Sequence, residues 1–254
     1  MPAYDYADVA DIYDDFCVFD EDIDFFREQA AHATGPVLEL MAGTGRVSLP
    51  MLESGVQLTC ADRSAAMLAV LDRKAGCRDL AVQLVCADVC ELPFAPAFDL
   101  ILLPFQGFTE LVGNEAQRHC LSEASRLLAP GGRFICTSHN PSARGQTIDG
   151  AVRELGRFQN AYGNTLVLQL QTVRSTRPGV VEGTQTIEIF DQEDRLIDKR
   201  VIELEFSLVP PSDIVEMARS SGLEPVHLFG DYERSAFDEE SSSCFVAVFE
   251  RMNA

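Results

Sequence analysis

The sequence is poor in basic residues. Lys and Arg together number 20 against 40 Asp and Glu, so the formal net charge at pH 7 is −20. A protein that binds a phosphate backbone needs a basic surface, and no run of Lys and Arg occurs here. We therefore expect no nucleic acid partner and no anionic membrane partner, and we interpret the acidity as favouring solubility in the cytoplasm.

Long apolar runs are also missing from the sequence, and we expect no leader. No stretch approaches the ~20 apolar residues that cross a bilayer, and the first 24 residues are acidic where a secretory signal would be basic and apolar. The eight cysteines include no C-x-x-C pair, and nothing near Cys86 and Cys90 supplies the remaining ligands of a tetrahedral metal site. We expect reduced thiols, no bound metal and a cytoplasmic location.

What the sequence does contain is a strand, a glycine turn and a helix within one short stretch. Residues 37–41 are an apolar run too short for a helix, which predicts a buried strand. Residues 42–45 form the turn, and the apolar spacing of residues 47–52 predicts a helix. Such a turn makes a nucleotide-type cradle, because small residues let the backbone approach a ligand and glycines tolerate unusual dihedral angles.

Glu39 indicates which ligand this cradle holds. A dinucleotide loop must bind a pyrophosphate, and a carboxylate beside it would repel that group. A carboxylate suits a ligand that carries an ammonium and a sulfonium. The spacing Glu39-x-x-x-Gly43-x-Gly45 agrees with this, because Ser48 replaces the third glycine of the dinucleotide fingerprint.

Acidic residues follow the next two predicted strands. Residues 57–61 end at Asp62, 17 positions beyond the second glycine of the turn, where a carboxylate can accept two hydrogen bonds from a ribose diol. Residues 81–86 are followed by Asp88 and Val89, where an acid and a backbone N–H can recognise adenine. Asp88 also fits a simple turn residue, so both interpretations stay open.

The strands and the helix predicted over residues 98–138 follow the order of an open α/β sheet. Residues 98–103 predict a buried strand that ends at residues 104–108, where the catalytic edge of such a sheet lies. A helix over 115–128, a turn at 130–132 and a strand over 133–138 come next.

Alternating apolar and polar residues then predict a different kind of sheet. The alternation recurs at 166–170, 187–189 and 202–206. It indicates a three-stranded antiparallel insert over roughly 160–208 that has one face exposed to solvent. The chain returns to the main sheet through a helix over 210–220 and strands over 226–229 and 244–249.

Residues 1–34 combine aromatic and acidic side chains. Their apolar spacing predicts two short helices before the first strand. One interpretation is that the aromatic residues pack these helices onto the domain. The other is that the helices form a lid over the ligand, with Tyr6 or Tyr13 facing the substrate.

Five motifs in this order resemble the class I S-adenosylmethionine (SAM)-dependent methyltransferases. They are the acidic first strand with Gly-x-Gly, the acid after the second strand, Ala-Asp after the third, Phe-Asp-Leu-Ile in the fourth and Leu-x-Pro-Gly-Gly before the fifth. The resemblance covers nearly the whole chain, and the insert is similar to that of glycine and amino-sugar N-methyltransferases. It implies an α/β fold with a Rossmann-like, seven-stranded, mostly parallel sheet and helices on both faces. The implied domains are an N-terminal helical lid (1–34), a SAM-binding domain (35–145 and 209–254) and a substrate-side antiparallel insert (146–208).

The resemblance also implies which residues hold SAM and its product S-adenosylhomocysteine. Around the methionine part it places Glu39, Ala42, Gly43, Thr44 and Gly45. It places Asp62 at the ribose with Arg63 beside it, and Met67, Asp88 and Val89 near the adenine. Beside the sulfonium it places Leu103, Pro104 and Phe105. The Asn-Pro-Pro-Tyr type sequence of amino-base and glutamine methyltransferases is absent after the fourth strand. Its absence argues against DNA bases and protein amides as acceptors.

The acceptor side of such enzymes has no family-wide motif. The reaction needs a nucleophile aligned with the methyl group, exclusion of water, and a base if the acceptor is protonated. The candidates at the mouth of the site are Tyr6, Tyr13, Glu110, His139 and Tyr232. Glu110 also fits a solvated surface carboxylate, and His139 fits a hydrogen-bonded histidine at a strand end.

We expect a cytoplasmic enzyme that transfers a methyl group from SAM to a nitrogen or oxygen of a small molecule. The alternatives are a methyltransferase for a protein side chain and a SAM-binding protein without catalysis. A homodimer is left open.

Overall fold

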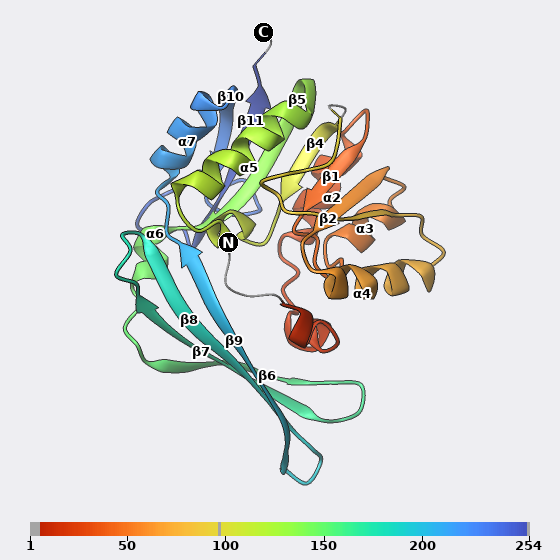
Figure 1. Cartoon of the computed structure of the whole chain (residues 1–254), viewed down its shortest axis with the longest axis vertical. Helices are drawn as coiled ribbons and strands as arrows, with labels where there is room; N and C mark the ends of the chain where they lie inside the picture. The colour runs from red at the N-terminus through yellow and green to blue at the C-terminus, as the bar shows by residue number, and fades with distance from the viewer. Residues whose placement is uncertain (1–5, 96–97, 253–254) are drawn as a thin grey trace.

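The computed structural model describes residues 6–95 and 98–252, and its main sheet lies in the upper half of the molecule as drawn in Figure 1, with helices around it. Within these residues the sheet has seven strands in the order β10-β11-β5-β4-β1-β2-β3. All neighbours from β5 to β3 pair in parallel, and β11 runs antiparallel to both β5 and β10. The predicted seven-stranded, mostly parallel Rossmann-like sheet is confirmed. Its strands are β1 (Val37–Leu40), β2 (Leu58–Asp62), β3 (Gln83–Cys86), β4 (Phe98–Leu103), β5 (Leu128–His139), β10 (Leu223–Phe229) and β11 (Cys244–Arg251).

Helices cover both faces of this sheet because its central strands are apolar on both sides. Leu38 and Leu40 of β1 join a core with α5 and α7, while Val37 of the same strand joins a core with α2, α3 and α4. This is the period-two alternation of a strand that is buried on both faces. The helices are η1 (Tyr6–Val9), α1 (Tyr13–Phe16), α2 (Ile23–Ala31), α3 (Ser48–Glu53), α4 (Ala65–Gly76), η2 (Gly107–Glu110), α5 (Asn114–Leu127), α6 (Pro141–Gly145) and α7 (Pro211–Ser220).

A second sheet is antiparallel and extends away from the main sheet (Figure 1). It contains β6 (Val152–Gln159), β7 (Thr165–Arg174), β8 (Val180–Phe190) and β9 (Leu196–Ser207). The prediction of three strands was wrong because β6 was missed. None of its side chains is fully buried, and a register shift between Glu154 and Gly156 interrupts its pairing with β7, so the strand shows no clear apolar alternation.

The turn predicted at 130–132 was also wrong. The strand β5 begins at Leu128 and runs through these residues, although its pairing with β4 shifts from Phe98–Leu128 to Leu100–Arg133. Pro and Gly mark a bulge here instead of a chain reversal. The helix predicted over 210–220 is confirmed, since α7 begins at Pro211 and Gly222 follows it with a φ of +84°.

We define the N-terminal segment as residues 6–31. Its first part, residues 6–16, lies between α4 and the antiparallel sheet, and α2 packs beside α3 (Figure 1). Val9, Ile12 and Phe16 pack on apolar residues of β7, β8 and β9, and Ala10 packs on α4. The guanidinium of Arg200 in β9 donates to the Asp8 carbonyl at 2.6 Å and pairs with the Asp11 carboxylate. The segment therefore joins the two sheets. Among the described residues, no helix has the length and apolar character needed to span a membrane.

Candidate functional site

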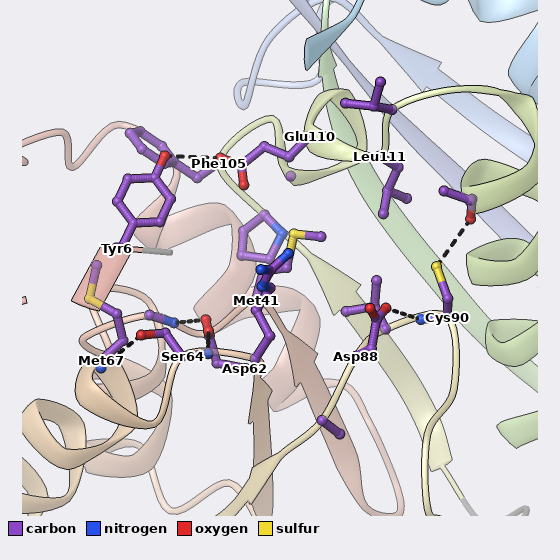
Figure 2. Close-up of a pocket in the computed structure, with 18 of the residues that line it drawn as sticks. Tyr6, Met41, Asp62, Ser64, Met67, Asp88, Cys90, Phe105, Glu110 and Leu111 are labelled. Carbon is purple, nitrogen blue, oxygen red and sulfur yellow. Dashed lines mark hydrogen bonds between the residues drawn. The ribbon is translucent and has the colours of Figure 1, made fainter. Parts of the chain in front are cut away.

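A cavity of about 350 Å³ lies where β1, β2, β3 and β4 end. Parallel strands present their carboxyl ends at one edge of a sheet, where ligands bind in open α/β folds. The N-terminal segment, α4, the loop after β4 and the start of α5 complete the wall. Figure 2 shows Tyr6, Asp62, Asp88 and Glu110 around the same space. The volume falls within the range of ~300–1,000 Å³ for small-molecule sites.

Most of the site residues expected from the sequence line this cavity. They are Tyr6, Tyr13, Gly43, Asp62, Arg63, Met67, Asp88, Val89, Pro104, Phe105 and Glu110. The expected residues outside its lining are Glu39, Ala42, Thr44, Gly45, Leu103, His139 and Tyr232. The lining residues that were not expected to contact a ligand are Met41, Ser64, Ala87, Cys90, Gly107, Leu111, Val112, Glu115, Ala116 and His119.

The two glycines of the turn after β1 have different surroundings. Gly43, with a φ of +56°, lines the cavity, and no atom lies within 4 Å of the position that a Cβ would take. Gly45 has a φ of +87°, and a Cβ there would lie 2.2 Å from Leu71 Cδ1 of α4. Gly43 thus leaves room for a ligand, whereas Gly45 lets the turn pack against α4.

Asp62 at the end of β2 holds this turn in place. One carboxylate oxygen accepts the Gly43 N–H at 2.8 Å, and the other accepts the Ser64 N–H at 2.8 Å (Figure 2). Ser64 is the N-cap of α4, as expected, and its hydroxyl accepts the Met67 N–H at 3.5 Å. The carboxylate therefore fixes the turn relative to α4 while it lies on the cavity wall.

The structure corrects the place expected for Glu39. Its side chain is 1% exposed and lies outside the cavity, where its carboxylate accepts the Ser48 hydroxyl at 2.5 Å. Burial raises the pKa of Glu39 to about 8, although the Ser48 hydroxyl acts in the opposite direction. The side chain lies on the α3 side of the sheet, so Glu39 supports the glycine turn through its bond to Ser48 at the start of α3. Ser48, which replaces a fingerprint glycine, is its hydrogen-bond partner.

Asp88 proves to be a turn residue that also lines the cavity. Its Oδ1 accepts the Cys90 N–H at 2.8 Å, and the residue is exposed to the cavity beside buried Val89 (Figure 2). Cys90 was not expected here; its thiol donates to the Ala116 carbonyl at 3.4 Å. Burial, and then the Asp88 charge, raise the pKa of Cys90 to about 12, so the thiol stays protonated.

The loop after β4 has an unusual backbone on the cavity wall. Phe105 and Gln106 have φ values of +53° and +54°, which cost roughly 1–2 kcal/mol for each residue with a side chain. The Gln106 N–H donates to Thr137 Oγ1 at 2.6 Å. The Phe105 ring lies 4.6 Å from the Arg46 guanidinium and 5.7 Å from the Phe19 ring, which belongs to the N-terminal segment.

The N-terminal segment closes one side of the cavity and is fastened to the glycine turn. The Tyr6 hydroxyl donates to Glu110 Oε1 at 3.3 Å, and the Tyr6 and Tyr13 rings meet edge to face (Figure 2 shows Tyr6 and Glu110). Arg46 pairs through both terminal nitrogens with Asp22, which is fully buried. Two further bonds join Thr44 and Lys74 to Asp14, each at 2.6 Å.

His139 and Tyr232 do not reach the cavity. The His139 ring packs edge-on against Phe206, and its backbone N–H donates to Thr109 Oγ1 at 3.4 Å. Burial, assisted by the Arg144 charge, lowers the pKa of His139 to about 4, so the ring is neutral at pH 7. Tyr232 packs against the rings of Phe19, Phe25 and Phe26. Neither side chain is among the residues that line this cavity.

The chemistry of the wall fits SAM better than a dinucleotide. Asp62, Asp88, Glu110 and Glu115 give the cavity an acidic lining, with Arg63 as a cationic side chain. Carboxylates attract an ammonium and accept ribose hydroxyls, whereas they would repel a pyrophosphate. The empty Cβ position of Gly43 provides the close backbone approach that such a ligand needs. Within the described chain, no group of three His, Cys, Asp or Glu residues is placed to hold a metal.

Comparison with known proteins agrees with this geometry. Residues 37–132, from β1 into β5, match the family described as a methyltransferase domain. A demethylmenaquinone methyltransferase of Thermus thermophilus is 38% identical over 112 residues, which are 43% of this chain and 49% of that protein. A cypemycin N-terminal methyltransferase of Streptomyces is 28% identical over 84% of this chain and 82% of its own length. The chain spans about half the length of the demethylmenaquinone methyltransferases that it matches.

Solved structures extend the similarity to the whole chain. The CcbJ methyltransferase of Streptomyces caelestis superposes with a TM-score of 0.83 at 25% identity and covers 98% of this chain and 100% of its own. The SAM-bound amino pentose methyltransferase CalS10 of Micromonospora echinaspora superposes with a TM-score of 0.68 at 17% identity and covers 98% of this chain and 93% of its own, a likeness of fold. Sheet order, cavity and matched domain agree: residues 37–132 match a methyltransferase domain, and the whole chain has the fold of SAM-dependent methyltransferases of known structure.

Proposed function

We propose that this protein transfers a methyl group from SAM to a small molecule, and that the acceptor atom is an amine nitrogen rather than an oxygen. SAM supplies a methyl group already activated by a positively charged sulfur. The chain has to bind the cofactor, align the acceptor, exclude water and receive a proton.

The observation that carries the proposal is the Tyr6–Glu110 pair on the cavity wall. Glu110 comes from η2 after β4, and Tyr6 comes from the N-terminal segment, so the pair forms only when the segment covers the cavity. In this proposal Glu110 attracts the acceptor ammonium and accepts its proton, because a base must lie within hydrogen-bond reach of the proton that it removes. Tyr6 orients Glu110, and the Tyr13 ring completes the cover.

The remaining cavity residues are proposed to hold the cofactor. Gly43 borders its methionine part, Asp62 and Arg63 its ribose, and Met67, Asp88 and Val89 its adenine. Phe105 forms the wall at the reacting end, beside Pro104. Residues 1–34 then act as a lid, residues 35–145 and 209–254 bind SAM, and the insert at 146–208 supports the acceptor side.

Two of the similar proteins favour nitrogen as the acceptor atom. CalS10 is described as an amino pentose methyltransferase, and the cypemycin enzyme as an N-terminal methyltransferase. The second of these makes the N-terminal amine of a peptide the alternative acceptor, because it matches 84% of this chain. Both acceptors present an ammonium to an acidic cavity.

A methyl-transfer assay tests the proposal. The protein is incubated with SAM and a panel of amino sugars, amino acids, short peptides with free N-termini, and phenols, and mass spectrometry detects products that have gained one methylene. We expect products from the amines and none from the phenols. Glu110→Gln should lower the rate by ~10²–10⁴-fold, the usual contribution of a general base.

The matched control is Glu216→Gln, because Glu216 is exposed on α7 and lies outside the cavity. It should leave the rate unchanged. An unaffected rate in Glu110→Gln would exclude the proposed base. A protein that binds no SAM in calorimetry would contradict the cofactor assignment itself.

A further inference from the structure

Thr137 lies behind the cavity wall and touches the loop that forms it. The residue is fully buried on β5 and does not line the cavity. The pairing of β4 with β5 ends at Leu103 and Cys136, so Thr137 is the first β5 residue beyond that ladder. Its hydroxyl oxygen accepts the Gln106 N–H at 2.6 Å, which ties the end of one strand to the loop after its neighbour.

The loop needs such a tie because its backbone is strained. Phe105 and Gln106 are consecutive residues with side chains in the left-handed region, which single residues adopt rarely and pairs more rarely still. Bonds within the loop run from the Gly107 N–H to the Pro104 carbonyl and from the Thr109 N–H to the Gln106 carbonyl. The Gln106 side chain makes no cap bond to η2. Thr137 thus anchors the loop backbone from outside.

The loop carries the groups that face the reacting end of the cavity. Phe105 and Gly107 line the wall, and Glu110 lies on η2, which begins directly after Gln106. Gly107 is itself closely packed, since a Cβ there would lie 2.7 Å from Leu103 Cδ1. A change in the backbone at Gln106 would therefore move both the Phe105 ring and the Glu110 carboxylate.

We propose that Thr137 is a positioning residue for methyl transfer: its hydroxyl accepts the Gln106 N–H and so holds the left-handed loop that places Phe105 and Glu110 in the cavity. The catalytic role of Glu110 rests on the proposed function, whereas the tie between Thr137 and the loop does not. The hydroxyl also lies beside the Tyr232 hydroxyl, but it acts on the reaction through the Gln106 backbone, so serine can replace threonine and valine cannot.

Three variants test this proposal. Thr137→Val keeps the shape and removes the acceptor, Thr137→Ser keeps the acceptor, and Thr59→Val is the matched control. Thr59 is buried on β2, where its hydroxyl bonds to the Gln83 side chain and has no contact with the loop. The hydrogen-exchange rate of the Gln106 amide measures whether its bond to Thr137 is present. Titration with S-adenosylhomocysteine measures cofactor binding, and the methyl-transfer assay measures kcat.

In Thr137→Val we expect the Gln106 amide to exchange about tenfold faster and kcat to fall about tenfold, consistent with the loss of one hydrogen bond. Affinity for S-adenosylhomocysteine should change much less, because Asp62 and the glycine turn are untouched. Thr137→Ser and Thr59→Val should behave as wild type. If Thr137→Val does not fold, Thr137→Ala takes its place in each comparison.

The proposal would be overturned if Thr137→Val left the exchange rate of the Gln106 amide and kcat unchanged. It would also be overturned if Thr137→Ser failed to keep both at their wild-type values. A wild-type protein that binds no S-adenosylhomocysteine would instead refute the proposed function. In that case hydrogen exchange at the Gln106 amide would still show whether Thr137 holds the loop.

Discussion

Asp62 has a structural task besides the one that its position after β2 suggests. Its carboxylate accepts the N–H groups of Gly43 and Ser64, so we expect Asp62→Ala to weaken S-adenosylhomocysteine binding at least tenfold and to lower the melting temperature as well. Hydrogen bonds to a charged group contribute about 1.5–3 kcal/mol each. For a domain of this size each kcal/mol shifts the melting temperature by about 2–4 °C. Calorimetry and thermal unfolding measure the two effects separately.

Asp62→Asn is the matched variant, because it keeps one acceptor oxygen. It should lie between wild type and alanine in both measurements. An alanine variant with unchanged affinity would show that the ribose is held elsewhere.

Glu39 should make the stability of the protein depend on pH. Its pKa is about 8 in the folded protein, where burial disfavours the charge, against 4.5 for an ordinary glutamate. Between these values the folded protein keeps a proton that the unfolded chain has lost, so stability falls as pH rises from about 5 to 8. The change is of the order of 3–5 kcal/mol. Urea unfolding at several pH values measures it.

Glu39→Gln keeps an acceptor for the Ser48 hydroxyl and removes the ionisation. Its stability should therefore show a smaller fall over the same pH window than that of wild type. Parallel curves for the two proteins would mean that Glu39 ionises normally.

At the scale of residues, sequence reasoning worked where the strand order determines position. Asp62 and Asp88 follow parallel strands, and the carboxyl ends of such strands share one edge. Glu39 lies outside the cavity because its side chain is on the α3 side of the sheet, a direction that strand order alone does not give. His119 could not be found, since only the packed position of α5 brings it to the cavity.

At the scale of elements, the ion pair between Arg46 and Asp22 joins the glycine turn to the N-terminal segment. Asp22 is fully buried, so Arg46→Met would leave a carboxylate without its partner, a change that typically costs about 3–5 kcal/mol. We expect a large loss of stability in urea unfolding, together with weaker contact between the segment and Phe105, whose ring packs on the same guanidinium.

The double variant Arg46→Met/Asp22→Leu separates the charge from the packing. It should recover most of the lost stability, because neither charge remains buried. A double variant as unstable as Arg46→Met would assign the effect to shape instead of charge.

The N-terminal segment is both packing and cover, two interpretations that the sequence left as alternatives. Its apolar residues complete a core with the antiparallel sheet, while Tyr6 and Tyr13 line the cavity. Removing the segment would uncover that core, so a truncation cannot test the cover alone. The strand β6 escaped prediction for a related reason, since both of its faces are largely solvent-exposed and apolar periodicity requires one buried face.

At the scale of the whole molecule, the net charge of −20 should govern the approach of the acceptor. A negative field attracts cations and is screened by salt, so kcat/KM for an amine acceptor should fall severalfold between about 0.02 and 0.5 M ionic strength. Steady-state kinetics in sodium chloride measure this. An amine acceptor that is uncharged at the assay pH is the control and should show little change; equal salt dependence for both amines would rule out steering by charge.

The bond between Arg200 and Asp11 joins residues 189 positions apart. Ribosomes add about 5–20 residues each second, so the N-terminal segment waits roughly 10–40 s before its partner strand exists. During that interval Val9, Ile12 and Phe16, which pack on β7, β8 and β9, lack their full core and are available to chaperones. The segment can make its contacts with β9 only after that strand has left the ribosome, so the wall of the cavity reaches its final packing late in the synthesis of the protein.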